Sequence, residues 1–145
     1  MKKIVIFDLN RTLYDPDTAC LVPGARFVLR VLLRRGFSLC LVSRAGRSRK
    51  KLIRELGIRK YFLRIVVSKE KGAKDFVRMV PRPAVRRACF VVGDRVRKEI
   101  RIGNALGFRT VWVQSGKFAA ERPRLKMERP TYRVRTLRDV LSVVH

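Results

Sequence analysis

Short apolar runs alternate with amphipathic segments along most of the chain. Each run is rich in β-branched and aromatic residues and is bounded by polar or turn residues, as is typical of buried strands. The segments between the runs repeat apolar residues at helical spacing and carry basic residues on another face. This pattern predicts strands at residues 3–7, 37–42, 64–67, 88–92 and 110–113, and a short last strand at 132–134.

The intervening segments predict helices with recognisable ends. The expected helices run from Pro23-Gly24 to Gly36, over 43–57, from near 74 to just before Pro81, and over 97–106. Thr136 and Asp139 resemble a capping box that opens a final helix. Residues 15–17 predict a loop, and residues 116–130, with two prolines and five bases, a basic loop or arm.

Strands that are apolar throughout and alternate with helices indicate a mostly parallel sheet covered on both faces. The predicted fold class is α/β: a single Rossmann-like three-layer domain over residues 1–145, with a mostly parallel sheet of five to six strands. A chain of 145 residues is long enough to bury the core of one such domain.

Polar residues directly follow the first four predicted strands. They are Asp8, Ser43, the pair Lys69 and Lys71, and Asp94. Because the carboxyl ends of parallel strands form one edge of a sheet, we expect a ligand site there. Carboxylates suit Mg²⁺, and a hydroxyl with an ammonium group suits phosphate oxygens. Acids at strand ends also cap turns, but four strands that each deliver a polar group favour phosphoryl chemistry.

Four segments resemble, in order and spacing, the motifs of the haloacid dehalogenase (HAD) superfamily of phosphohydrolases. They are residues 6–14, residues 41–43, Lys71 with Lys69 as the alternative, and residues 91–100. The resemblance covers nearly the whole chain. It implies that Asp8 is the nucleophile and a Mg²⁺ ligand, that Ser43 and Lys71 bind phosphate, and that Asp94 and Glu99 hold the metal.

One position departs from the family's pattern. Its phosphatases carry a second Asp two residues after the nucleophile, which protonates the leaving group and then activates water. Here that position is Asn10, whose amide can hydrogen-bond but cannot exchange a proton. General acid–base help is typically worth about 10²–10⁴ in rate. We therefore expect weak or absent phosphatase activity, or a long-lived aspartyl-phosphate.

Three arginines lie beside the motif residues: Arg11, Arg44 and Arg95. If the strand ends converge, these side chains form a positive collar around an acidic centre, and their forked guanidinium groups match phosphate oxygens. The gaps between the first three motifs span about 35 and 28 residues and are filled by predicted elements. The resemblance therefore implies a member without a cap domain, whose open site admits a large substrate.

The chain is strongly basic: 36 Lys+Arg outnumber 11 Asp+Glu, which gives a formal net charge of +25. Most of this charge has no internal partner, and self-repulsion disfavours the compact state. A polyanionic partner is therefore expected, nucleic acid before an anionic membrane surface. The candidate nucleic-acid-binding residues are Arg47, Arg49, Lys50, Lys51, Arg54, Arg122, Arg124, Lys126 and Arg129.

Two functions follow from these observations. The first is an RNA-binding, ribonucleoprotein- or ribosome-associated protein with weak or absent phosphatase activity. The alternative is a Mg²⁺-dependent capless phosphohydrolase that acts through an aspartyl-phosphate on a nucleic-acid phosphate or a phosphoprotein. The apolar runs are too short to span a membrane, and we expect a cytoplasmic protein. The one histidine, His145, makes a His-ligated zinc site improbable.

Overall fold

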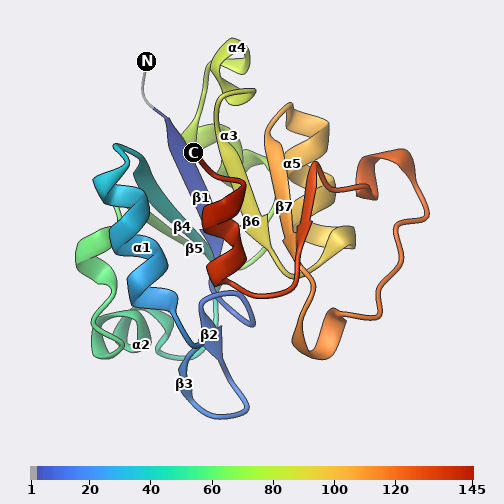
Figure 1. Ribbon diagram of the computed structural model, residues 1–145. Coiled ribbons are helices and arrows are strands. Elements are labelled where there is room, and N and C mark those ends of the chain that lie inside the picture. Colours follow the sequence, from blue (N-terminus) through green and yellow to red (C-terminus); the bar gives the residue numbers. More distant parts are fainter. Residues whose placement is uncertain (1–2) are drawn as a thin grey trace.

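A six-stranded sheet forms the middle layer of the computed structural model, which describes residues 3–145 (Figure 1). The strand order is β5-β4-β1-β6-β7-β8, and every neighbouring pair runs parallel. The strands are β1 (Ile4–Asp8), β4 (Ser38–Arg44), β5 (Arg64–Ser68), β6 (Phe90–Gly93), β7 (Arg109–Val113) and β8 (Tyr132–Val134). The predicted fold class and all six predicted strands are confirmed.

Helices cover both faces of this sheet, because successive residues of each strand point to opposite sides and both sets are apolar. In β1, Val5 and Phe7 pack under α1 (Ala25–Arg34), α2 (Arg49–Glu55) and the 3₁₀-helix η5 (Arg138–Ser142). Ile4 and Ile6 pack on the other face. That face is covered by α3 (Ala73–Met79) and α5 (Arg101–Leu106), with the short α4 (Pro83–Arg86) beside them.

Several elements differ from the sequence-based expectation. The helix expected over 43–57 is wrong at its start: β4 continues to Arg44, and α2 begins only at Arg49. Ser48, in the left-handed conformation with φ of 57°, separates the two elements. The first part of the helix expected over 97–106 is a π-helical turn, η2 (Val96–Ile100), and α5 begins only at Arg101.

Further short elements were absent from the prediction. The expected loop at 15–17 is the turn of a two-stranded ribbon, β2 (Tyr14–Asp15) and β3 (Cys20–Leu21). A 3₁₀-helix, η1 (Arg59–Tyr61), follows α2. In the described chain these short elements, α1 and α2 fill the intervals from β1 to β5. No separate folded unit stands between those strands, in agreement with the expected lack of an inserted cap.

The C-terminal helix is 3₁₀ rather than α, and only half of its expected capping box forms. Thr136 Oγ1 accepts a hydrogen bond from the N–H of Asp139 at 3.3 Å. Within residues 3–145, no helix is both long and apolar enough to cross a membrane.

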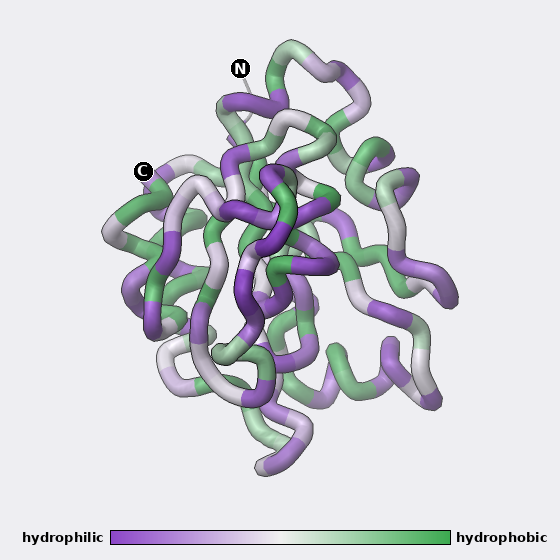
Figure 2. Tube along the Cα trace, turned by 90° about the vertical axis from the view of Figure 1, so that its right-hand side faces the viewer, coloured by the Kyte–Doolittle hydropathy of each residue, from purple (hydrophilic) through white to green (hydrophobic). Residues whose placement is uncertain are grey.

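The basic segment between β7 and β8 is a loop with two 3₁₀ turns, η3 (Gly116–Phe118) and η4 (Lys126–Glu128). Its second half is fixed to α5, because Asn104 Nδ2 donates to the carbonyl oxygens of Met127 and Arg129 at 2.8 and 2.7 Å. Figure 2 shows the molecule from the right-hand side of Figure 1, where strongly hydrophilic stretches of chain cross the front. The loop is therefore anchored to the domain while its basic side chains stay exposed.

Candidate active site

A cleft of about 380 Å³ opens at the carboxyl ends of β1, β4, β5 and β6. It is lined by Asp8, Asn10, Arg11, Ser43, Arg44, Lys69, Glu70, Lys71, Asp94, Arg95, Lys98, Glu99 and Phe118. The structure thus brings together every residue that the sequence assigned to catalysis, phosphate binding or metal binding.

Three buried carboxylates form the floor of the cleft. Asp8 ends β1, Asp94 follows β6, and Glu99 lies on η2; one oxygen from each lies within 4.8 Å of the others. Gly93 makes this approach feasible, since a Cβ at that position would lie 2.9 Å from Glu99 Cβ and Oε2. Any side chain at Gly93 would push Glu99 away from the other two acids.

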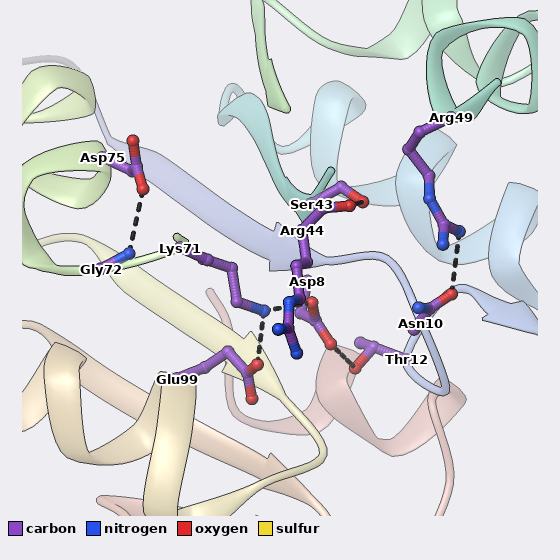
Figure 3. A network of polar contacts seen from close by, with 10 residues as sticks. All are labelled: Asp8, Asn10, Thr12, Ser43, Arg44, Arg49, Lys71, Gly72, Asp75 and Glu99. Atoms are coloured by element: carbon purple, nitrogen blue, oxygen red, sulfur yellow. Dashed lines mark hydrogen bonds and ion pairs between the residues drawn. The ribbon is translucent and has the colours of Figure 1, made fainter. Parts of the chain in front are cut away.

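Lys71 joins two of these acids (Figure 3). Its Nζ lies 2.7 Å from Asp8 Oδ1 and 2.6 Å from Glu99 Oε1. Lys69, the sequence alternative, is exposed at the cleft wall. Directly after Lys71, the N–H of Gly72 donates to Asp75 Oδ2 at 3.0 Å, and this cap begins α3. The buried Asp75, which the sequence analysis missed, thereby fixes the chain direction that sends Lys71 into the cleft.

Burial strongly affects the ionisation of the floor. Desolvation, reinforced by the charges of Asp8 and Glu99, raises the pKa of Asp94 to about 8. Desolvation and the charge of Asp8 likewise raise the pKa of Glu99 to about 7, although Lys71 opposes the rise. For Lys71, burial lowers the pKa, but the charges of Asp8 and Glu99 outweigh it and raise the net value. Lys71 is therefore a permanent cation at neutral pH.

The floor suits a divalent cation. Asp94 Oδ2 and Glu99 Oε2 are buried and accept no hydrogen bond from the described residues. A buried carboxylate oxygen without a partner is costly, and the one ammonium of Lys71 cannot balance the charge of all three acids when they are ionised. Hard carboxylate oxygens are the ligands that Mg²⁺ prefers. Asp8, Asp94 and Glu99 thus fit the Mg²⁺ site predicted from the sequence.

The raised pKa values predict how metal-free protein responds to pH. Both Asp94 and Glu99 have folded-state pKa values above the ordinary carboxyl value of about 4, so between about pH 4 and 8 the folded state binds more protons than the unfolded state. The free energy of unfolding therefore falls as pH rises through this window. We expect the melting temperature in EDTA to fall from pH 5.5 to 8.5, and saturating Mg²⁺ to remove the fall. A metal-free melting temperature that rises with pH would contradict this expectation.

The arginine collar (Arg11, Arg44 and Arg95) lines the cleft, but its members are not equally available. Arg11 Nη1 lies 3.1 Å from Asp17 Oδ2. Arg95 Nη2 lies 3.2 Å from Glu121 Oε2, and its guanidinium stacks 3.9 Å from the centre of the Phe118 ring. Arg44 is exposed. Arg44 is therefore the collar member best placed to meet an incoming anion.

Arg49 differs from its neighbours on the predicted nucleic-acid-binding face, which are Arg47, Lys50, Lys51 and Arg54. Its Nη1 donates to Asn10 Oδ1 at 3.1 Å (Figure 3). The other four side chains are exposed, whereas Arg49 is half-buried. Arg49 therefore contacts a residue of the cleft without lining the cleft itself.

Three supporting contacts escaped the sequence analysis. Thr12 Oγ1 donates to Asp8 Oδ2 at 3.4 Å, and the indole N–H of the buried Trp112 donates to the carbonyl oxygen of Asp94 at 2.9 Å. Glu121 Oε1 accepts from the N–H of Val96 at 3.1 Å, which fixes the loop after Asp94. Glu121 is one of two acids in the basic segment 117–131, the other being Glu128, and this was the sequence signal for its role.

The comparisons with known proteins agree with this geometry. The family described as HAD-hydrolase-like matches residues 59–140. A glyceraldehyde 3-phosphate phosphatase from Methanopyrus kandleri is 35% identical over 124 residues, which cover 80% of this chain and 53% of that protein. The chain thus spans about half the length of this relative.

Solved structures show the same fold. An uncharacterized protein from Listeria monocytogenes serotype 4b matches with a TM-score of 0.80 and 21% identity, over 98% of this chain and 96% of that one. The HAD-hydrolase YfnB from Bacillus subtilis, bound to magnesium, matches with a TM-score of 0.70 and 21% identity, over 86% of this chain and 56% of that one.

Proposed function

The chain belongs to the HAD-hydrolase-like family, and from this we propose that it is a Mg²⁺-dependent phosphohydrolase with Asp8 as nucleophile. One observation carries the proposal: Lys71 Nζ contacts both Asp8 and Glu99 on the floor of an open cleft, with Asp94 beside them. A carboxylate nucleophile next to a permanent cation and a divalent-metal site is suited to attack on a phosphate group.

The residues divide the reaction between them. An oxygen of Asp8 forms a bond to phosphorus while the bond from phosphorus to the leaving-group oxygen breaks. Water then cleaves the aspartyl-phosphate, which releases phosphate and restores the carboxylate. Lys71 and the Ser43 hydroxyl hold the phosphate oxygens. Asp8, Asp94 and Glu99 would hold Mg²⁺, which neutralises charge on the phosphate when bound.

A chromogenic aryl phosphate tests this proposal directly. In the presence of Mg²⁺ we expect slow steady-state release of dinitrophenol from dinitrophenyl phosphate, because Asn10 cannot activate the water that cleaves the aspartyl-phosphate. In EDTA we expect no release. Release that is equally fast in EDTA, or absent at every Mg²⁺ concentration, would reject the phosphohydrolase. Restoration by Mg²⁺ after chelation is the control for irreversible damage.

A second candidate function, binding of structured RNA, is favoured by the unpaired positive charge. The formal net charge is +25, and within residues 3–145 the ion pairs engage four basic side chains, those of Arg11, Lys51, Lys71 and Arg95. The predicted nucleic-acid-binding residues other than Arg49 are exposed on α2, in the turn before it and in the β7–β8 loop. We propose that they contact RNA phosphates, within a ribonucleoprotein such as the ribosome.

Salt dependence distinguishes such binding from adsorption. Each neutralised phosphate contributes a slope of roughly −0.7 to −0.9 to log affinity against log salt. Replacing Arg47, Lys50, Lys51 and Arg54, which lie on α2 and in the turn before it, by Gln should make the slope shallower by two units or more. The same change at Arg122, Arg124, Lys126 and Arg129 should have the same effect. A control variant changes the exposed Arg34, Lys74, Arg82 and Arg87. Equal effects in all three variants would reject a localised RNA surface.

A further inference from the structure

The orientation of the Asn10 amide follows from its partner. A guanidinium group only donates hydrogen bonds, so the Asn10 atom that lies 3.1 Å from Arg49 Nη1 must be the oxygen, Oδ1. The amide nitrogen, Nδ2, therefore points away from Arg49. Asn10 lines the cleft, and Arg49 reaches it from the α2 side (Figure 3). Nδ2 is thus an oriented hydrogen-bond donor on a residue that lines the cleft.

The Arg49 side chain is itself held in place. Its backbone starts α2 after the left-handed Ser48. A Cβ at Gly46 would lie 3.2 Å from Arg49 Nη2, so glycine leaves the space that the guanidinium occupies. Arg49 Nε is buried without a hydrogen-bond partner among the described residues. The contact with Asn10 therefore compensates part of the cost of placing this cation at the site.

The groups around the mouth of the cleft are mostly neutral or cationic hydrogen-bond donors. They are Asn10, the arginine collar, Lys69 and Lys98, with the exposed Glu70 as the one carboxyl group of this lining. On the floor, Asp8 and Glu99 are paired with Lys71, and Asp8, Asp94 and Glu99 are suited to the metal. The Asn10 amide stabilises an anion yet does not protonate it at neutral pH. A leaving group that is held by Asn10 Nδ2 therefore departs as an anion.

We propose that Arg49 is a positioning residue that presents Asn10 Nδ2 to the leaving-group oxygen, and that the site prefers phosphoric anhydrides over alkyl phosphate esters. This inference rests on the proposed function. When Asp8 attacks an anhydride, the bond to the bridging oxygen breaks, its electron pair stays on that oxygen, and a phosphate anion leaves without taking up a proton. An alkyl ester would have to expel an alkoxide, which the Asn10 amide cannot protonate.

The leaving-group dependence of kcat/KM tests the preference, because kcat/KM reports the steps up to leaving-group departure and not the later attack of water. Across dinitrophenyl, nitrophenyl and phenyl phosphate we expect kcat/KM to fall by about 10² or more, the range that a missing general acid implies. Inorganic pyrophosphate should exceed glyceraldehyde 3-phosphate by at least about tenfold, by the same reasoning. A flat aryl series, or preference for the alkyl ester, would overturn the inference.

The positioning role has its own signature. Arg49→Met should lower kcat/KM about tenfold for phenyl phosphate but less than about threefold for dinitrophenyl phosphate, because an oriented donor matters most where the leaving oxygen carries most charge. Arg49→Lys keeps a donor for Oδ1 and should restore part of the loss. The exposed Arg34→Met is the control for lost charge.

The outcomes separate this inference from the function on which it rests. An Arg49→Met variant that loses activity equally on all aryl phosphates, or loses none, would overturn the positioning role. Asp8-dependent turnover with a flat leaving-group series would overturn the anhydride preference while leaving the phosphohydrolase intact. Absence of Asp8-dependent turnover on dinitrophenyl phosphate would overturn both.

Discussion

Asp8→Asn is expected to lower kcat/KM for dinitrophenyl phosphate by at least about 10⁴, the order of loss seen when a nucleophile is removed. The amide cannot form the bond to phosphorus, and it loses the ion pair of 2.7 Å with Lys71. Asp139→Asn makes the same change of charge at an exposed site outside the cleft and should leave activity unchanged.

A covalent intermediate provides an independent measurement of the same prediction. Acid-quenched protein incubated with substrate should carry a base-labile phosphate in the wild type and none in Asp8→Asn. Folding is not expected to explain the loss, since the substitution does not remove the second partner of Lys71, Glu99, which lies 2.6 Å from Nζ in the unmodified protein. Residual turnover in Asp8→Asn above about 1% of the wild-type rate, with an unchanged melting temperature, would mean that another group attacks phosphorus. Removal of a nucleophile ordinarily lowers the rate far more than that.

The residues of the floor could be predicted from the sequence because their positions follow a general rule of parallel sheets. Apolar strands that alternate with helices make a parallel sheet, and residues after those strands meet at one edge. Asp8, Ser43 and Asp94 needed no side-chain detail to be placed together. The strands themselves were recognisable for the same reason, since burial on both faces makes each one apolar throughout.

The choice between Lys69 and Lys71 could not be made from the sequence. Both residues follow β5 within three positions, and which one enters the cleft depends on the direction of the chain after the strand. That direction is set by the cap between Gly72 and Asp75. Glycine at a helix N-cap gives no side-chain signal, so nothing in the local pattern distinguished the two lysines.

The contact of Arg49 with Asn10 could not be predicted for a related reason. Helical periodicity assigns faces only if the first residue of the helix is known, and β4 extends to Arg44 while α2 starts five residues later. Gly46 and the left-handed Ser48 mark this interval, but a positive φ at a serine is uncommon and is not expected from sequence. Trp112 and Glu121 act on the site through contacts across 18 and 25 residues, which no local pattern encodes.

The charge and the site suggest different partners, and the two proposals are compatible. The cleft is open, and the exposed basic residues of α2 and of the β7–β8 loop lie outside its lining. An RNA bound on those surfaces and a phosphate bound over Asp8 would therefore use separate side chains. Measuring turnover of dinitrophenyl phosphate with saturating RNA would show whether the two sites compete.

Asn10→Asp is expected to raise kcat/KM for phenyl phosphate by tenfold or more, since a carboxyl at this position can supply part of the general acid term of about 10²–10⁴. The gain should be small for dinitrophenyl phosphate, whose leaving group needs no proton. The neighbouring Arg49 limits the gain, because a guanidinium 3.1 Å from the present Oδ1 favours the ionised form of the introduced acid.

Combining Asn10→Asp with Arg49→Met relieves that restraint. The acid then keeps its proton to higher pH, and the double variant should exceed the single one on phenyl phosphate, with the difference largest near neutral pH. The matched control combines Asn10→Asp with Arg49→Lys, which retains the cation, and it should behave as Asn10→Asp alone. If neither Asn10→Asp nor the double variant gains activity, the missing acid is not what limits turnover. The block would then lie at the mouth, where Arg11 and its pair with Asp17 narrow the approach to Asp8.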